Sequence, residues 1–219
     1  MMSESSPQPA GARKRERRHP DARRQALIDA TLRCLSDRGV EQTSVRRISE
    51  QAGVSVGLVN HYYRSKDELV ADAYAQVADN LLAALTAEVA RSGGTARQRL
   101  SAFFRASFSA VVLDPDLLRV WLSFWGMAYR SGAIAQVHDR TYGEYLDVLE
   151  QMLADLAREQ GLHGLDTRLV AVGIAGLLDG LWVEWCLNTR TFTPEQGVLL
   201  CEAGLDGMIA RLDGAGAPP

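Results

Sequence analysis

The stretch GVSVGLVNHYYRSKDEL, Gly53–Leu69, places a turn and two helix starts within seventeen residues. Gly53 suits the positive φ of a tight turn, and Ser55 suits the N-cap of a short helix. Ser65 and Glu68 form a capping box that opens a second, longer helix. The run between the two caps is too short to bury much apolar surface, and its polar residues are unusual for a core. Packing alone therefore does not explain this helix.

The residues before this stretch predict two more helices. A helical period begins after Asp21, and Gly39 is the expected stop of that first helix. Thr43 or Ser44 caps the next one, which ends at the turn of Gly53. Two short helices joined by a glycine turn form a helix-turn-helix, so we expect a three-helix DNA-binding domain at 20–66.

The third helix presents one face that is suited to a DNA groove. Val56, Gly57, Asn60 and His61 share this face, while Val59 points the opposite way. Glycine allows close approach of the backbones, valine touches a thymine methyl group, and asparagine and histidine bond base edges. Phosphate contacts are expected nearby. The full set of predicted DNA-binding residues is Ser44, Arg46, Ser55, Val56, Gly57, Asn60, His61, Tyr62 and Lys66.

Charge supports a nucleic-acid partner at one end only. Residues 1–66 carry 13 Lys or Arg and 7 Asp or Glu, a net charge of +6, whereas the remainder carries 11 and 20, a net charge of −9. Residues 1–19 are rich in Ser, Pro, Gly and Arg and are expected to form a disordered basic arm. The arm either reaches DNA or is a solvated tail, and charge does not decide between them.

The sequence TSVRRISEQAGVSVGLVNHYYRSKDELV, Thr43–Val70, resembles the DNA-binding region of the tetracycline-repressor (TetR) family, and the likeness extends over about 21–74. The resemblance implies an all-α homodimer with an N-terminal three-helix domain and a C-terminal ligand-binding and dimerisation domain in each subunit. Val56 stands where many members have Lys or Arg, and Asn60 replaces a common aromatic residue.

Two C-terminal segments hold all four tryptophans. These are RVWLSFWGMAYRSG, Arg119–Gly132, and GLLDGLWVEWCL, Gly176–Leu187. Aromatic faces with carboxylates suit an ammonium ion, although helical spacing of aromatics is equally typical of a core. The candidate ligand-binding residues are Trp121, Trp125, Tyr129, Glu144, Asp179, Trp182, Glu184 and Trp185. These residues favour an organic cation, choline-like or polyamine, as the effector of a DNA-binding repressor. Both segments resemble the choline-responsive BetI-type repressors, and this resemblance makes choline the first candidate. The alternative is a repressor of an efflux or catabolic operon that responds to drugs or other lipophiles.

Small residues on the last two helices predict a contact between subunits. Gly173, Gly176 and Gly180 lie three and four apart on one helix. A similar stripe on the last helix consists of Gly197, Cys201, Gly204 and Met208. Because glycine weakens a helix interior, close helix–helix approach is the better explanation, within the chain or across a dimer. We expect a homodimer formed by these two helices of each subunit.

Other classes of protein receive little support. The four histidines have no partners at metal-ligand spacing, and we find no catalytic or nucleotide-binding motif, so neither metal nor cofactor is expected. An all-α enzyme or scaffold remains the remote alternative. Three scattered cysteines, the lack of a leader pattern and the lack of an apolar run of spanning length predict a cytoplasmic protein without a membrane partner.

The chain is thus expected to be all-α. The predicted order is an arm at 1–19, the helix-turn-helix domain at 20–66, the ligand-binding and dimerisation domain at 67–213, and a disordered tail at 214–219. A long helix that begins at Lys66 is expected to join the two domains, so that its tilt changes the spacing of the two recognition helices.

Overall fold

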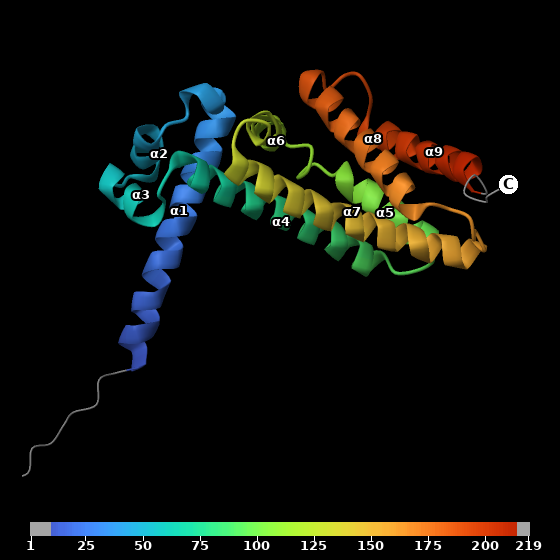
Figure 1. Ribbon diagram of the computed structural model, residues 1–219, viewed down its shortest axis with the longest axis horizontal. Helices are drawn as coiled ribbons and strands as arrows, with labels where there is room; N and C mark the ends of the chain where they lie inside the picture. The colour runs from blue at the N-terminus through green and yellow to red at the C-terminus, as the bar shows by residue number, and fades with distance from the viewer. Residues whose placement is uncertain (1–9, 214–219) are drawn as a thin grey trace, which may run out of the picture. The chain divides into compact units, whose positions relative to one another are not determined.

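The computed structural model describes residues 10–213, with side chains from Asp21 onward, and this range contains nine α-helices and no strand. The all-α prediction is confirmed (Figure 1). The chain divides into two compact units between Ala73 and Tyr74. This boundary lies inside helix α4 (Lys66–Ser92), seven residues beyond the expected one at 66/67.

The first unit contains α1 (Ala10–Gln42), α2 (Val45–Ala52), α3 (Val56–Tyr62) and the beginning of α4. The backbone of 10–19 belongs to α1, which differs from the arm expected there; residues 1–9 and the expected tail at 214–219 lie outside the described residues. Ala, Arg, Lys and Glu all favour helix, so a polar composition does not by itself oppose one.

The core of the first unit comes from the inner faces of these short helices. Leu35, Ile48 and Val59, from α1, α2 and α3, are each at most 1% exposed. Gly39 interrupts the helical backbone of α1 with a φ of +71°, at the position where the sequence predicts a stop. The turn after it buries Thr43, whose hydroxyl donates to the Gly39 carbonyl oxygen at 2.7 Å.

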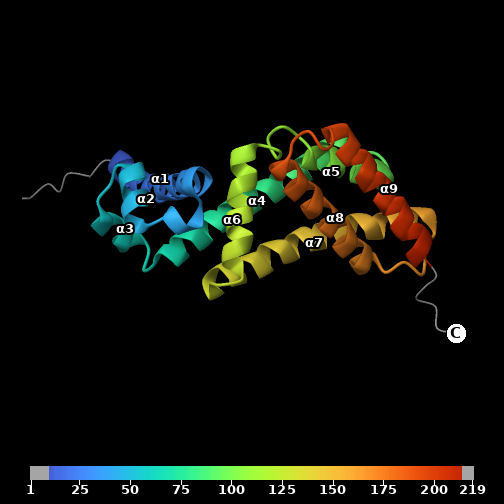
Figure 2. The same ribbon diagram turned by 90° about the horizontal axis from the view of Figure 1, so that it is seen from above.

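The second unit contains the rest of α4 and five further helices, seen from a second side in Figure 2. These are α5 (Ala96–Ser107), α6 (Pro115–Ala128), α7 (Gly132–Gln160), α8 (Thr167–Leu187) and α9 (Pro194–Leu212). Helix α7 contacts α5, α6 and α8, and α9 packs on α5 and α8. The unit is therefore held together by α7 and α8.

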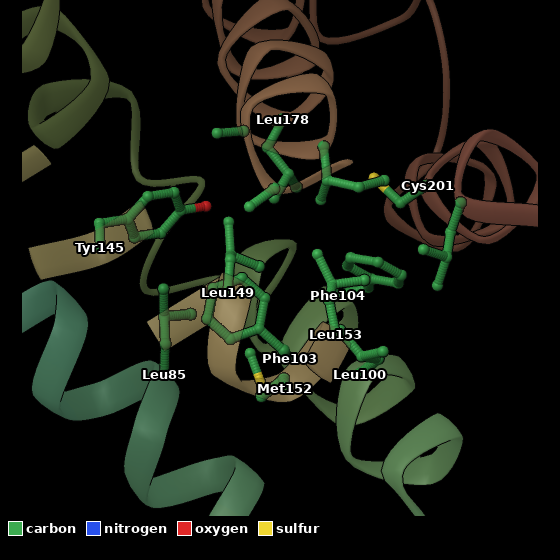
Figure 3. Packing of buried hydrophobic residues seen from close by; sticks show 14 of the residues in the cluster. Leu85, Leu100, Phe103, Phe104, Tyr145, Leu149, Met152, Leu153, Leu178 and Cys201 are labelled. Carbon is green, nitrogen blue, oxygen red and sulfur yellow. The ribbon is translucent and has the colours of Figure 1, made fainter. Parts of the chain in front are cut away.

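Side chains from α5, α7, α8 and α9 meet in one hydrophobic core (Figure 3). Phe103 and Phe104 of α5, Leu149 and Leu153 of α7 and Leu178 of α8 are completely buried. Cys201 of α9 lies in this cluster with an exposed fraction of 0%. This burial corrects the prediction that Cys201 belongs to a stripe between subunits.

The glycines of α8 and α9 fall into two groups. A Cβ at Gly197 would lie 2.6 Å from the Phe108 ring, and one at Gly204 would lie 2.8 Å from Leu177. A Cβ at Gly173 would lie 2.7 Å from Met208. These glycines allow close packing within the chain, which corrects the assignment of the α9 stripe to a dimer contact. Gly176 and Gly180 instead have nothing within 4 Å of an added Cβ.

Helix α8 is the one described helix that is long and apolar enough to cross a membrane, judged by length and composition alone. This corrects the expectation that no run reaches that length. In the structure the helix packs on α7 and α9 and buries one face, which includes Val170, Ile174 and Leu178.

Candidate nucleic-acid interface and ligand cavity

Helix α3 is set by the caps that the sequence predicts. Ser44 Oγ accepts from the Arg47 amide at the start of α2, and Ser55 Oγ accepts from the Leu58 amide at the start of α3. Gly53 adopts the left-handed conformation between the two helices, with a φ of +67°. The two helix starts of the helix-turn-helix are thus stabilised by hydrogen bonds between a serine side chain and a backbone amide three residues away.

The two faces of α3 have opposite character. Val59 is 1% exposed and packs into the unit, whereas Ser55, Val56, Gly57, Asn60 and His61 are all exposed. Val56 keeps 41% of its surface exposed. The predicted recognition face therefore points out of the protein as a continuous surface.

The end of α3 is held by a clamp that the sequence did not reveal. Tyr63, the C-cap residue, is buried, and its hydroxyl donates to Asp72 Oδ2 of α4 at 2.5 Å. Arg24 of α1 donates to both oxygens of the same carboxylate, at 2.8 and 2.6 Å. Burial and the bond to Asp72 raise the pKa of Tyr63. The clamp fixes α3 against its neighbours, because three helices meet at one carboxylate.

Besides Ser44, two more of the residues predicted to contact phosphates have hydrogen-bond partners within the protein. Arg46 Nε donates to Glu50 Oε1 at 3.0 Å, and its side chain is largely exposed. Lys66 Nζ donates to the Thr43 carbonyl oxygen at 3.3 Å. Tyr62 is half-buried and meets the His61 ring edge-on. Lys66 therefore ties the first turn of α4 to the turn before α2.

The second unit contains a partly open cavity of about 50 Å³ between α4, α6, α7 and α8. Its lining combines aromatic rings with few polar groups. The lining residues are Tyr74, Ala78, Leu81, Leu82, Trp121, Trp125, Thr141, Tyr142, Tyr145, Asp179 and Trp182. Among them no lysine or arginine occurs, and Asp179 is the only carboxylate.

Asp179 gives the cavity its negative potential. The carboxyl group is half-buried, and Oδ2 accepts a bond from the Tyr142 hydroxyl at 3.1 Å. Burial raises its pKa to about 6, and the bond from Tyr142 opposes this rise. No ion pair of Asp179 occurs among the described residues. A carboxylate buried without a cation is costly, so a positive ligand would be favoured beside it.

The aromatic walls are held by one another. Tyr74 stacks on Phe124 with a centroid separation of 4.5 Å and meets Trp121 edge-on at 5.5 Å. The Tyr74 hydroxyl bonds His138 Nδ1 at 2.7 Å. Trp121 lies 6.4 Å from Trp125. Ring faces of this kind attract cations, more strongly when water is excluded.

Four of the eight predicted ligand-binding residues line the cavity: Trp121, Trp125, Asp179 and Trp182. The other four lie elsewhere. Tyr129 is the C-cap of α6 and is 94% exposed, because the helix ends at Ala128 and the i, i+4 pattern stops with it. Glu144 faces solvent and accepts from Arg140, and Glu184 is exposed and accepts from Thr191.

Trp185 packs against Phe192 at 5.4 Å, away from the cavity lining. The sequence analysis missed seven lining residues, which are the three tyrosines, Thr141 and three apolar positions of α4, Ala78, Leu81 and Leu82. Tyr74, Tyr142 and Tyr145 come from two amphipathic helices, where a tyrosine gives no signal that separates a cavity wall from an ordinary core position. Only their position around Asp179 in the folded chain shows that these tyrosines line the cavity.

A helix-turn-helix unit joined to a helical unit with an aromatic cavity is typical of regulators that couple DNA binding to a small molecule. Residues 27–73 match the family of bacterial regulatory proteins called tetR, and residues 96–210 match the C-terminal domain of BetI-type transcriptional repressors. The chain belongs to the TetR family and is a transcriptional repressor of BetI type. It is a regulator rather than an enzyme.

Similar proteins agree with this assignment. The regulator BetI of Pectobacterium atrosepticum is 31% identical over 193 residues, covering 86% of this chain and 95% of that protein. A crystal structure described as a transcriptional regulator from Pseudomonas aeruginosa PAO1 is 49% identical, with a TM-score of 0.85 over 90% of this chain and 95% of that chain. A regulator from Saccharomonospora viridis, solved with choline, is 17% identical with a TM-score of 0.73 over 85% and 96% of the two chains, which shows a shared fold alone.

Proposed function

We propose that α3 lies in the major groove of an operator and that its exposed face reads bases. The support is the outward set Val56, Gly57, Asn60 and His61 on a helix whose other face is buried. Asparagine offers a donor and an acceptor that match adenine, and valine suits a thymine methyl group. Arg46 and Lys66 lie beside this face for phosphate contacts, once their present internal partners are exchanged.

The effector that the cavity best fits is a small organic cation. The observation that carries this proposal is one carboxylate without an ion-pair partner, Asp179, inside a wall of aromatic rings. Carboxylate and ring faces both stabilise an ammonium ion, whereas an anion would meet the same charge and quadrupoles unfavourably. The choline complex of the Saccharomonospora viridis regulator makes choline the first cation to test.

A subunit contact through α8 and α9 is proposed for the outer faces of these helices. Leu169 and Val172 of α8 and Leu199 and Leu200 of α9 are each 47–62% exposed. Gly176 and Gly180 lie on the same side of α8 with open space above them. Large apolar side chains beside glycines suit a second copy of the same helices, since a two-fold contact places one patch on itself.

Release of DNA would follow from linkage between the two sites. Tyr74, Ala78 and Leu81 of α4 line the cavity, and Asp72 of the same helix holds Tyr63 at the end of α3. A cation that favours another tilt of α4 must weaken operator binding, and the operator must weaken cation binding by the same factor. Dimeric helix-turn-helix proteins match half-sites about 34–36 Å apart, so a small tilt is sufficient to lose the match.

The experiment is a gel-shift titration with the DNA that flanks the gene, followed by addition of choline, a polyamine and a neutral lipophile. We expect salt-dependent binding to a pseudo-palindrome and release by a cation. Asn60→Ala should relax preference at one base pair at a cost of about 1–3 kcal/mol. If Asn60→Ala leaves both operator affinity and base preference unchanged, α3 does not lie in the groove as proposed. If the lipophile alone releases the DNA, the effector is a lipophile and not a cation.

A further inference from the structure

Tyr145 of α7 contributes a polar atom to the cavity region that nothing in the structure satisfies. The residue is 8% exposed and lines the cavity, and its hydroxyl oxygen is buried without a hydrogen-bond partner. Among the described side chains only Ser36, in the first unit, shares this condition. Buried hydroxyl groups usually have partners, so an exception needs an explanation.

The Tyr145 ring lies among other rings of the second unit, with its hydroxyl group between α7 and α8. The Tyr145 ring lies 5.8 Å from Phe103 and stacks on Tyr142 at 6.2 Å. In Figure 3 it reaches from α7 toward α8, with its oxygen on the side of Leu178. Burial and the nearby Asp179 raise the pKa of Tyr145 well above its ordinary value. The hydroxyl therefore stays protonated and is available as a donor.

The other hydroxyl groups around the cavity are already engaged. Tyr142 donates to Asp179, and Tyr74 bonds His138. Thr141 donates to the Val137 carbonyl oxygen of its own helix at 2.9 Å. Among the hydroxyl groups of the cavity-lining residues, Tyr145 is thus the donor without a partner.

We propose that the effector carries a hydrogen-bond acceptor beside its positive charge and that Tyr145 donates to this acceptor. This inference rests on the proposed function, in which a cation occupies the cavity. The ligand class is a small ammonium ion with a hydroxyl, ether or carbonyl oxygen a few bonds from the nitrogen. The cation lies against the rings and Asp179, and the oxygen replaces the missing partner of Tyr145.

The test is calorimetry with a matched pair of cations. Choline and propyltrimethylammonium differ only in that a methyl group replaces the hydroxyl group. Propyltrimethylammonium offers no acceptor to the buried Tyr145 hydroxyl. The wild-type protein should therefore bind choline roughly 10-fold more tightly than propyltrimethylammonium. In Tyr145→Phe the two affinities should become equal, through weaker binding of choline and unchanged binding of the alkyl ion.

Thr141→Val is the matched control, because it also removes a cavity hydroxyl, but one that is already bonded to its own helix. It should keep the preference for choline. Tyr145→Phe removes an unsatisfied group, so its melting temperature should equal or exceed that of the wild type. Two results would overturn the inference and leave the cation proposal standing. One is that the wild type binds both ions with equal affinity, as when a retained water satisfies Tyr145. The other is a preference for choline that survives Tyr145→Phe. Failure of both ions to bind overturns the two together.

Discussion

Gly57 has space around it that the protein leaves empty, since an added Cβ would come no closer than 3.8 Å to Ser55 Oγ. Nothing inside the molecule therefore requires glycine here. We expect Gly57→Ala to keep or slightly raise stability, because alanine favours helix by up to about 1 kcal/mol. Operator affinity should fall at least tenfold, because the methyl group would separate α3 from the base edges.

Gly126→Ala of α6 is the control for this substitution. An added Cβ there also meets nothing within 4 Å, but the position lies in the other unit. Denaturation curves and gel shifts on both variants separate the two effects. Equal operator affinity in Gly57→Ala and wild type would show that α3 does not approach DNA at this point.

Asp179 makes stability depend on pH in a defined direction. Its pKa is raised to about 6, above the ordinary value near 3.9, so the protonated form is favoured in the native state. The stability that this group contributes is complete below about pH 4 and is lost as the pH rises through 6. We expect the free energy of unfolding of the wild type, relative to Asp179→Asn, to fall by about 2 kcal/mol between pH 4 and 7.5.

Chemical denaturation of both proteins at several pH values measures this difference. A bound cation reverses the balance, because it stabilises the ionised carboxylate, so choline should bind more tightly as the pH rises through 6 and release protons. A difference between the two proteins that stays constant over this range would show that Asp179 is not desolvated.

At the scale of helices, the packing of α9 depends on a glycine at one crossing. A Cβ at Gly197 would lie 2.6 Å from the ring of Phe108, which is 3% exposed and meets Phe192 edge-on. The buried ring has little room to move, so Gly197→Ala should lower the free energy of unfolding by about 1–3 kcal/mol. Gly143→Ala of α7, where an added Cβ meets nothing, should be neutral or stabilising, and equal effects of the two in urea denaturation would exclude this close approach.

The sequence predicts some features of the individual helices and not others. The caps and outward face of α3 were predictable because Ser44, Gly53 and Ser55 act on atoms a few residues away. The cavity was predictable only in part, because periodicity tells which residues share a face and not which helix covers that face. Trp182 and Trp185 are three residues apart, yet only the first reaches the cavity. The stripe of Gly197 and Cys201 was misassigned for the same reason.

At the scale of the whole molecule, the proposed dimer can be tested on α8. Val172 is 47% exposed, so Val172→Arg should fold normally as a single chain, yet it would place two desolvated guanidinium groups in a two-fold contact. We expect monomers in sedimentation equilibrium and loss of tight binding to a palindromic operator. Val111→Arg, in the turn between α5 and α6 and 76% exposed, should remain dimeric. A dimeric Val172→Arg would place the contact elsewhere.

The distribution of tryptophan has a practical consequence. All four lie between residues 121 and 185, so the DNA-binding unit has none. Intrinsic fluorescence excited at the red edge of the indole band therefore reports on the ligand unit alone, and three of the four emitters line its cavity. Far-ultraviolet circular dichroism reports on the helices of both units. The unlabelled protein thus carries two separate signals, and heating curves that fail to superimpose would reveal one unit unfolding before the other.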